Sequence, residues 1–155
     1  MDPTDAGNSS DASDAGNPTD GGDANAGGDS ASGISVVSVT LLDTSITNVV
    51  QGSPVAGYDP IANNATISQA TVGTQLSIRA NTNPSPTGSV NFSLDGTNHT
   101  ESSLPYTLCG DDGAGTITNC NITQATHTLT VTPYSAAALG GDAGTPLTIT
   151  FTLSP

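Results

Sequence analysis

The chain has 155 residues, with 14 Asp or Glu against one Lys or Arg, and its formal net charge is -13. Nucleic acid and anionic membrane surfaces are bound through several basic side chains, so both partners are excluded. No apolar run reaches the ~18 residues of a transmembrane helix, and we expect no membrane insertion. Only 10% of the residues are charged, against about 25% in an ordinary domain. A surface made polar by Thr, Ser, Asn and Gly favours an extracellular or cell-surface protein.

Residues 1–33 are the first predicted region, an acidic segment rich in Asp, Gly, Ala and Ser. From Asp5 to Ser30 it contains no Val, Ile, Leu, Phe, Tyr or Trp. Such a segment buries too little apolar surface to offset the entropy lost on folding, so we interpret it as an extended linker or tail. Its loose nine-residue repeat lacks the large apolar residue and the GGxGxD core of calcium-binding β-rolls, which favours a plain tether. Met1 is followed directly by acidic residues, and we expect that a signal peptide has been removed.

Residues 34–155 are predicted to form one domain, and its first element is the strand "ISVVSVTLL" at residues 34–42. This segment has apolar residues at both odd and even positions, and it follows the flexible linker directly. It can pair within its own domain as an ordinary first strand. It can also complete the open sheet of a neighbouring copy, and such a head-to-tail contact would build a filament.

The next elements alternate apolar and polar residues, as strands buried on one face do. Clear strands are predicted at 75–80, 89–96, 127–134 and 146–154, and weaker ones at 64–68 and 103–108. The residues expected to face inward are Leu76, Ile78, Ala80, Val90, Phe92, Leu94, Leu129, Val131, Leu147, Ile149, Phe151 and Leu153, while Ser77, Arg79 and rows of Thr face outward. Gly-, Pro- and Asn-rich turns separate the strands, and no long helical pattern occurs. The fold class is therefore all-β, a single immunoglobulin-like antiparallel β-sandwich.

Cys109 and Cys120 flank the short loop "CGDDGAGTITNC". In a chain of extracellular character this arrangement predicts a local disulfide, formed in an oxidising compartment. Two free buried thiols are the alternative. The spacing fits no zinc site, because two further ligands would be needed and neither histidine lies near the pair in sequence.

Three stretches resemble a family of bacterial extracellular Ig-like modules. They are "LSIRANTNPSPTGSVNFSLDG", "TESSLPYTLCGDDGAG" and "THTLTVTPYSAAALGGDAGTPLTITFTLS", which together run from Leu76 to Ser154. Modules of this type occur in secreted and surface proteins, and the acidic segment is similar to the linkers of some bacterial surface lipoproteins. The resemblance implies a β-sandwich in an extracellular role and no reaction. The cysteine pair departs from the pattern of the family.

Candidate sites are few. Asp95, Asp111 and Asp112 lie on turns and could ligate Ca²⁺, but they offer few of the six to eight oxygens that it needs, so a solvated acidic loop is the favoured interpretation and no metal is expected. His127 is expected to face inward beside Leu129, and His99 to lie solvated in a turn. Arg79 is expected to pair with a surface acid.

No catalytic constellation is visible: no G-x-S-x-G occurs and no pair of carboxylates is expected across a cleft. We expect no enzymatic activity and no cofactor. Sequons for N-glycosylation occur at Asn8, Asn64, Asn91, Asn98 and Asn121, and the outward Thr rows are candidates for O-linked sugars.

The predicted function is a structural or adhesive extracellular subunit whose partner is another copy of itself or a cell-surface component. The alternative is a polysaccharide-binding accessory module of a larger secreted protein. The absence of Trp weighs against that alternative, since sugar-binding modules use exposed aromatic platforms. Three tyrosines, Tyr58, Tyr106 and Tyr134, remain as candidates, and those beside Pro105 and Pro133 are expected to pack at edges.

Overall fold

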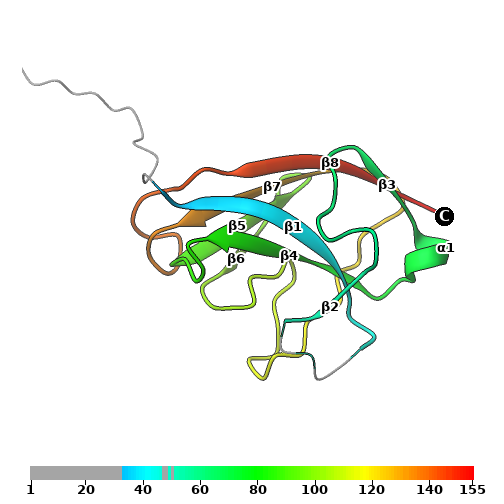
Figure 1. The fold of residues 1–155 in the computed structure, drawn as a ribbon, viewed down its shortest axis with the longest axis horizontal. Coiled ribbons are helices and arrows are strands. Elements are labelled where there is room, and N and C mark those ends of the chain that lie inside the picture. Colours follow the sequence, from blue (N-terminus) through cyan, green and yellow to red (C-terminus); the bar gives the residue numbers. More distant parts are fainter. Residues whose placement is uncertain (1–32, 47–48, 50) are drawn as a thin grey trace, which may run out of the picture.

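Eight strands form two sheets in the computed structural model, which describes residues 33–46, 49 and 51–155. The small sheet has the order β2 (Ser53–Pro54), β1 (Ser35–Asp43), β4 (Leu76–Asn83). The large sheet has the order β3 (Ala65–Ser68), β8 (Leu147–Ser154), β7 (Thr126–Tyr134), β5 (Ser89–Leu94), β6 (Thr97–Glu101). One helical turn, α1 (Gln69–Val72), follows β3. Figure 1 shows the small sheet lying across the large one, so the predicted all-β sandwich is confirmed.

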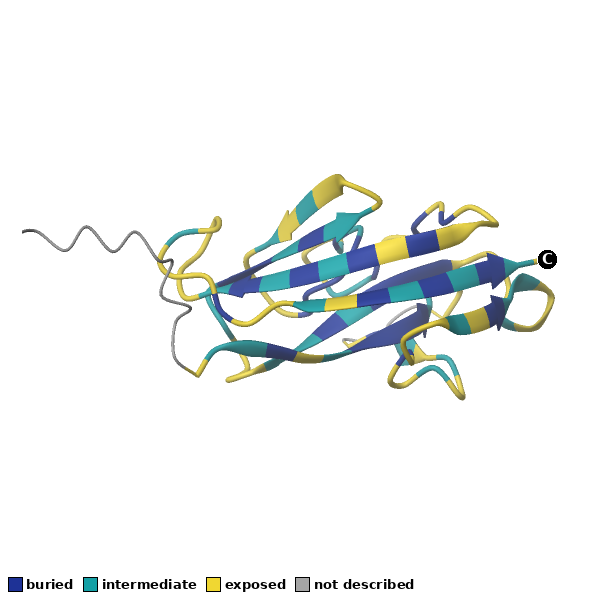
Figure 2. Ribbon diagram, turned by 90° about the horizontal axis from the view of Figure 1, so that it is seen from above, coloured by how far each residue is buried: buried dark blue, intermediate teal, exposed yellow. Residues whose placement is uncertain are grey.

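The core lies between the sheets and is built by the predicted alternation. Figure 2 shows buried and more exposed residues in alternating bands along the strands. Phe92, Phe151, Leu129 and Val131 of the large sheet are all essentially inaccessible to solvent, and they meet Ile78 of the small sheet in one apolar cluster. Each such side chain contributes roughly 1.5–3 kcal/mol through burial. These inward assignments were therefore correct.

The first strand, β1, pairs with β4 of the same chain along its whole length. This is the first of the two alternatives considered for residues 34–42. A bulge between Val36 and Ser38 explains why apolar residues occur at both odd and even positions. The inward-facing residues are Val36 before the bulge, and Val39 and Leu41 after it. The bulged Val37 is 63% exposed, whereas Val36 and Val39 on either side are buried in the core. Leu42 is buried on the opposite face, where a Cβ on Gly52 would come within 2.6 Å of it.

Two strands differ from the sequence-based expectations. The strand β3 pairs with β8 in parallel, so the large sheet is mixed and not purely antiparallel. The strand β6 differs from the turn that the sequence predicts around His99, because the turn is confined to Asp95 and Gly96. Both residues have positive φ, 51° and 86°, which makes a two-residue hairpin turn. The chain therefore resumes the sheet at once, and β6 pairs antiparallel with β5.

The segment that follows β6 covers the edge of β4 without forming the strand expected at 103–108. Its backbone pairs with β4 at single points, through Ala80 N–H to Tyr106 O and Leu108 N–H to Ile78 O. Tyr106 is fully buried, not placed at an edge, and its hydroxyl donates to Thr87 O. Burial raises the pKa of this phenol. The same segment covers Ser77, which was expected to face solvent and is buried.

Arg79 lies on the outer face of the small sheet, as expected. It does not pair with an acid in the described part of the chain. Its guanidinium donates to Gln51 O at 2.6 Å and to Asn81 Oδ1 at 3.3 Å. A backbone carbonyl and an amide therefore replace the carboxylate that was predicted.

The described chain begins at one end of the sandwich. Ser35 bridges to Thr145, just before β8, and Thr145 N–H donates to Ile34 O. The other end of β8 lies beside the start of β7, where Thr152 is opposite Thr126. The eight residues of β8 separate these ends by about 25 Å. Residues 1–32 lie outside the described residues, as do the predictions made for them, and no described helix is long and apolar enough to cross a membrane.

Candidate functional site

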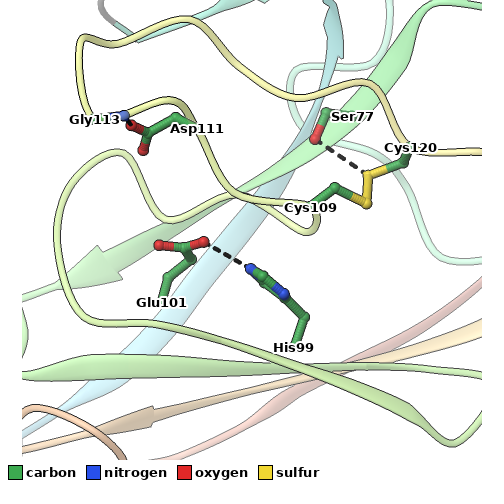
Figure 3. A network of polar contacts seen from close by, with 7 residues as sticks. All are labelled: Ser77, His99, Glu101, Cys109, Asp111, Gly113 and Cys120. Carbon is green, nitrogen blue, oxygen red and sulfur yellow. Dashed lines mark hydrogen bonds and ion pairs between the residues drawn. A yellow bond between two sulfur atoms is a disulfide. The ribbon is translucent and has the colours of Figure 1, made fainter.

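The predicted disulfide joins Cys109 to Cys120, with 5.7 Å between their Cα atoms. Both ends of the loop are attached to β4. Leu108 N–H donates to Ile78 O at 2.8 Å, and Cys120 N–H donates to Leu76 O at 2.7 Å. The Ser77 hydroxyl lies 3.5 Å from the Cys120 sulfur, beside the bridge (Figure 3). The disulfide thus holds an irregular loop against a regular strand.

The carboxylates inside this loop organise the loop itself. Asp111 accepts a hydrogen bond from Gly113 N–H at 2.6 Å, as Figure 3 shows. Asp112 accepts from the N–H groups of Thr116 at 3.0 Å and Ala114 at 2.8 Å, and these donors hold its pKa below 3.8. No group of three or more His, Cys, Asp or Glu with metal-binding geometry occurs in residues 33–46, 49 and 51–155. The structure therefore does not bring Asp95 together with the two loop carboxylates.

A second pair of polar groups lies on β6, below the disulfide loop. His99 Nε2 is 2.7 Å from Glu101 Oε1, and the Glu101 side chain is only 14% exposed (Figure 3). Gly110 closes over this pair with φ of +78°, and a Cβ there would lie 2.9 Å from the Glu101 oxygen. His99 is thus a half-buried strand residue. The expectation of a solvated turn histidine was wrong because the hairpin turn ends at Gly96.

A third polar group connects the β5–β6 turn to β7. His127 is buried, as predicted, and its Nδ1 lies 2.6 Å from Asp95 Oδ2. Its Nε2 lies 2.8 Å from Thr123 O, and Thr128 N–H donates to the other Asp95 oxygen at 2.8 Å. The hydrogen bond from His127, and then that from Thr128, hold the pKa of Asp95 below 3.8. The sequence marked Asp95 as a calcium candidate, but its observed role is to fix the turn to β7.

These elements line a cavity of about 490 Å³ that opens to solvent, at the end of the sandwich remote from residue 33. The apolar part of its lining is Leu94, Leu108, Ile122 and the disulfide. Its polar part includes Thr97, His99, Asn121 and Thr123. Sequence reasoning missed this cavity, because its walls come from four separate stretches that only the tertiary fold brings together.

The histidines and two of the tyrosines differ in burial and in the partners that they contact. In the described residues, His127 has a partner at each ring nitrogen, Asp95 Oδ2 and Thr123 O, whereas His99 has Glu101 at Nε2. Tyr106 is in the core, and Tyr58 donates its hydroxyl to Thr66 O.

Four of the five sequons fall in the described region, and Asn8 lies outside it. Asn64, Asn98 and Asn121 are exposed. Asn91 is partly buried and donates to Asn98 Oδ1 at 3.3 Å. Glycosylation of any of them stays a prediction.

No known protein family matches this sequence, and no curated protein matches it significantly. One solved structure is similar, that of the fibronectin(III)-like modules of CbhA from Clostridium thermocellum, with a TM-score of 0.39 and 16% identity. The match covers 77% of this chain and 48% of that one, so this chain spans about half the length of the structure that it matches. The sequence motifs quoted above and the character of the acidic segment are not tested by this match. The assignment as a β-sandwich stands on the strand pairing itself.

Proposed function

We propose that this chain is a non-catalytic, extracellular module with a structural or adhesive role, held at a distance by its acidic segment, residues 1–33. The disulfide supports an oxidising compartment. The outer face of the large sheet also supports the proposal, because uncharged polar side chains there face water. Its side chains include the cross-strand threonine pairs Thr130–Thr148 and Thr126–Thr152, whose hydroxyl oxygens are 2.9 Å apart in each pair.

The observation that carries the proposal is the separation of the two ends of the sandwich. The chain enters beside Thr145, and the disulfide and the cavity lie at the other end, near Thr126 and Cys120. A module attached through residues 1–33 would therefore point its cavity end away from the point of attachment. Such an orientation suits a display or adhesion module.

The test uses intact cells that make the protein. An antibody against the folded domain and proteinase K, added outside the cells, are expected to reach the domain. Trypsin is unsuitable, because Arg79 is the one Lys or Arg of the chain and lies in β4. Full protection until the cells are lysed, together with free thiols at Cys109 and Cys120 in the native protein, would contradict the proposal.

Assembly into a filament through residues 34–42 is a finer form of this proposal. A strand donated by a neighbouring copy would repeat the contacts that β1 makes with β4 in its own chain. Exchange of β1 between copies therefore adds no new strand contacts. It would be favoured by a high protein concentration. Sedimentation of the full chain and electron microscopy of native material test it. A monomer at all concentrations, with no filaments, would refute assembly.

Carbohydrate binding is the second candidate function. The observation that favours it is the cavity beside the disulfide. It is compatible with the display role, since an adhesive module needs a ligand.

A further inference from the structure

We infer that the cavity beside the disulfide is a binding site for a neutral pyranose saccharide. This inference rests on the geometry of the cavity and does not depend on the extracellular location. Its volume of about 490 Å³ falls within the 300–1,000 Å³ that is usual for small-molecule sites. A site of this size accommodates one or two sugar rings.

The charge of the site excludes anionic ligands. No Lys or Arg lines the cavity, and Arg79 lies on the other sheet. Asp95 is on the cavity wall, and its carboxylate is already bonded to His127 and to Thr128 N–H. A phosphate or uronate would meet a negative wall in a chain of net charge -13, with no basic group to neutralise it.

The distribution of apolar and polar groups fits the two chemistries of a pyranose. Leu94, Leu108 and Ile122 offer an apolar surface for the C–H face of a sugar ring. Thr97, Asn121 and Thr123 line the same cavity and are exposed to solvent, so their hydroxyl and amide groups are available to sugar hydroxyls. His99 uses Nε2 for Glu101, which leaves Nδ1 as a further polar atom.

The disulfide and the His99–Glu101 contact pre-organise the cavity. The bridge fixes Cys109 and Cys120, which both line it, to the edge of β4. Gly110 favours the close approach of the loop to β6, since its φ of +78° suits glycine and a Cβ there would lie 2.9 Å from the Glu101 oxygen. Because this wall is already formed, less free energy is lost in ordering the loop when a ligand binds. This gain compensates for the absence of an aromatic platform.

The experiment is an NMR titration of the full, ¹⁵N-labelled chain with the methyl glycosides of glucose, galactose, mannose and N-acetylglucosamine. At least one sugar is expected to shift the amide signals of residues 97–99 and 120–123. Glucuronate is expected to cause no shifts, and glucosamine to bind no more tightly than glucose. Glucosamine binding tenfold more tightly would make the cavity a cation site and overturn the inference. No shift with any glycoside at 50-fold excess over ~1 mM protein, or shifts elsewhere only, would also overturn it.

Two variants on one strand provide a matched control. Thr97 is paired with inward-facing Leu94 and lines the cavity, whereas Thr100 is paired with Asn91 on the outer face. Thr97→Ala and Asn121→Ala are each expected to weaken binding about three- to tenfold, the value of one lost hydrogen bond. Thr100→Ala is expected to leave affinity unchanged. Equal effects of Thr97→Ala and Thr100→Ala would contradict the assignment of the site, and the unligated spectrum of each variant reports whether it is folded.

Discussion

The large sheet and the segment that pairs with the edge of β4 in the small sheet, residues 102–125, are stabilised in different ways. In the sheet, β5, β7 and β8 are joined by continuous ladders, and alternate side chains fill the core. In place of a ladder, the segment has single bridges to β4, one disulfide, the buried side chain of Tyr106, and hydrogen bonds within itself. Stability in the sheet is therefore distributed over many residues, whereas in the segment it depends on a few. The candidate site lies where these two regions meet.

Removing a core side chain of the sheet should have the largest effect. Phe151 is 1% exposed and packs against His127 with 5.3 Å between ring centroids. Phe151→Ala is expected to lower the free energy of unfolding by about 3–5 kcal/mol, measured by urea denaturation. Leu104→Ala, at a 43% exposed position of the segment, should cost less than about 1 kcal/mol. Similar costs for the two variants would show that the burial of Phe151 in the sheet contributes little to stability.

Opening the disulfide should have the next largest effect and a local one. The bridge spans 11 positions, and a closed loop of that length contributes about 2–3 kcal/mol in the chain-entropy treatment. The double variant Cys109→Ala, Cys120→Ala should lose that amount in urea denaturation. In this variant, hydrogen exchange should accelerate more at the backbone amides of positions 108 and 120 than at those of β7. Uniform acceleration across β7 and the segment would contradict the contrast between the two regions.

The same contrast explains what could be predicted from sequence. Alternation is a local signal, and it predicted β4, β5, β7 and β8 with the correct inward faces. The strand β6, the parallel pairing of β3 and the burial of Ser77 and Tyr106 depend on contacts between distant parts of the chain, which a period-two pattern does not record. In the candidate site the cysteine pair was predictable from its loop. The link from Asp95 to His127 was not, because these residues are 32 positions apart.

A second irregular loop, at the opposite end, is held by a hydroxyl in place of a disulfide. Ala138 and Leu139 both have positive φ, 53° and 60°. The buried Ser89 hydroxyl donates to Ala136 O at 2.7 Å and accepts from Leu139 N–H at 3.0 Å. Ser89→Ala should cost about 1–2 kcal/mol, since two backbone groups lose their partner. Leu139→Gly should gain up to about 1 kcal/mol by relieving backbone strain. A loss for Leu139→Gly would show that its side-chain packing outweighs the strain.

Acid should weaken the contact between the β5–β6 turn and β7. The folded-state pKa of Asp95 lies below the ordinary 3.8, so its stabilising contribution is complete above that value and is lost as the pH falls through the folded pKa. The Asp95 side chain is 48% exposed, and screening by water limits the effect to at most about 1 kcal/mol. Urea denaturation between pH 5 and pH 2.5 should show Asp95→Asn losing less stability on acidification than the native chain. Parallel curves would mean that Asp95 contributes nothing to the acid response.

The smallest effect is expected on the outer face of the large sheet. Thr130 Oγ1 lies 2.9 Å from Thr148 Oγ1 across β7 and β8, but both residues remain partly or fully accessible to water. Thr130→Val keeps the β-branched shape that favours a strand and loses one hydroxyl contact that water can replace. We expect a change of less than about 0.5 kcal/mol in the free energy of unfolding. A loss above 1 kcal/mol would mean that the threonine rows stabilise the sheet through a connected network. The outer face would then be, like residues 102–125, a region in which a few polar contacts determine stability.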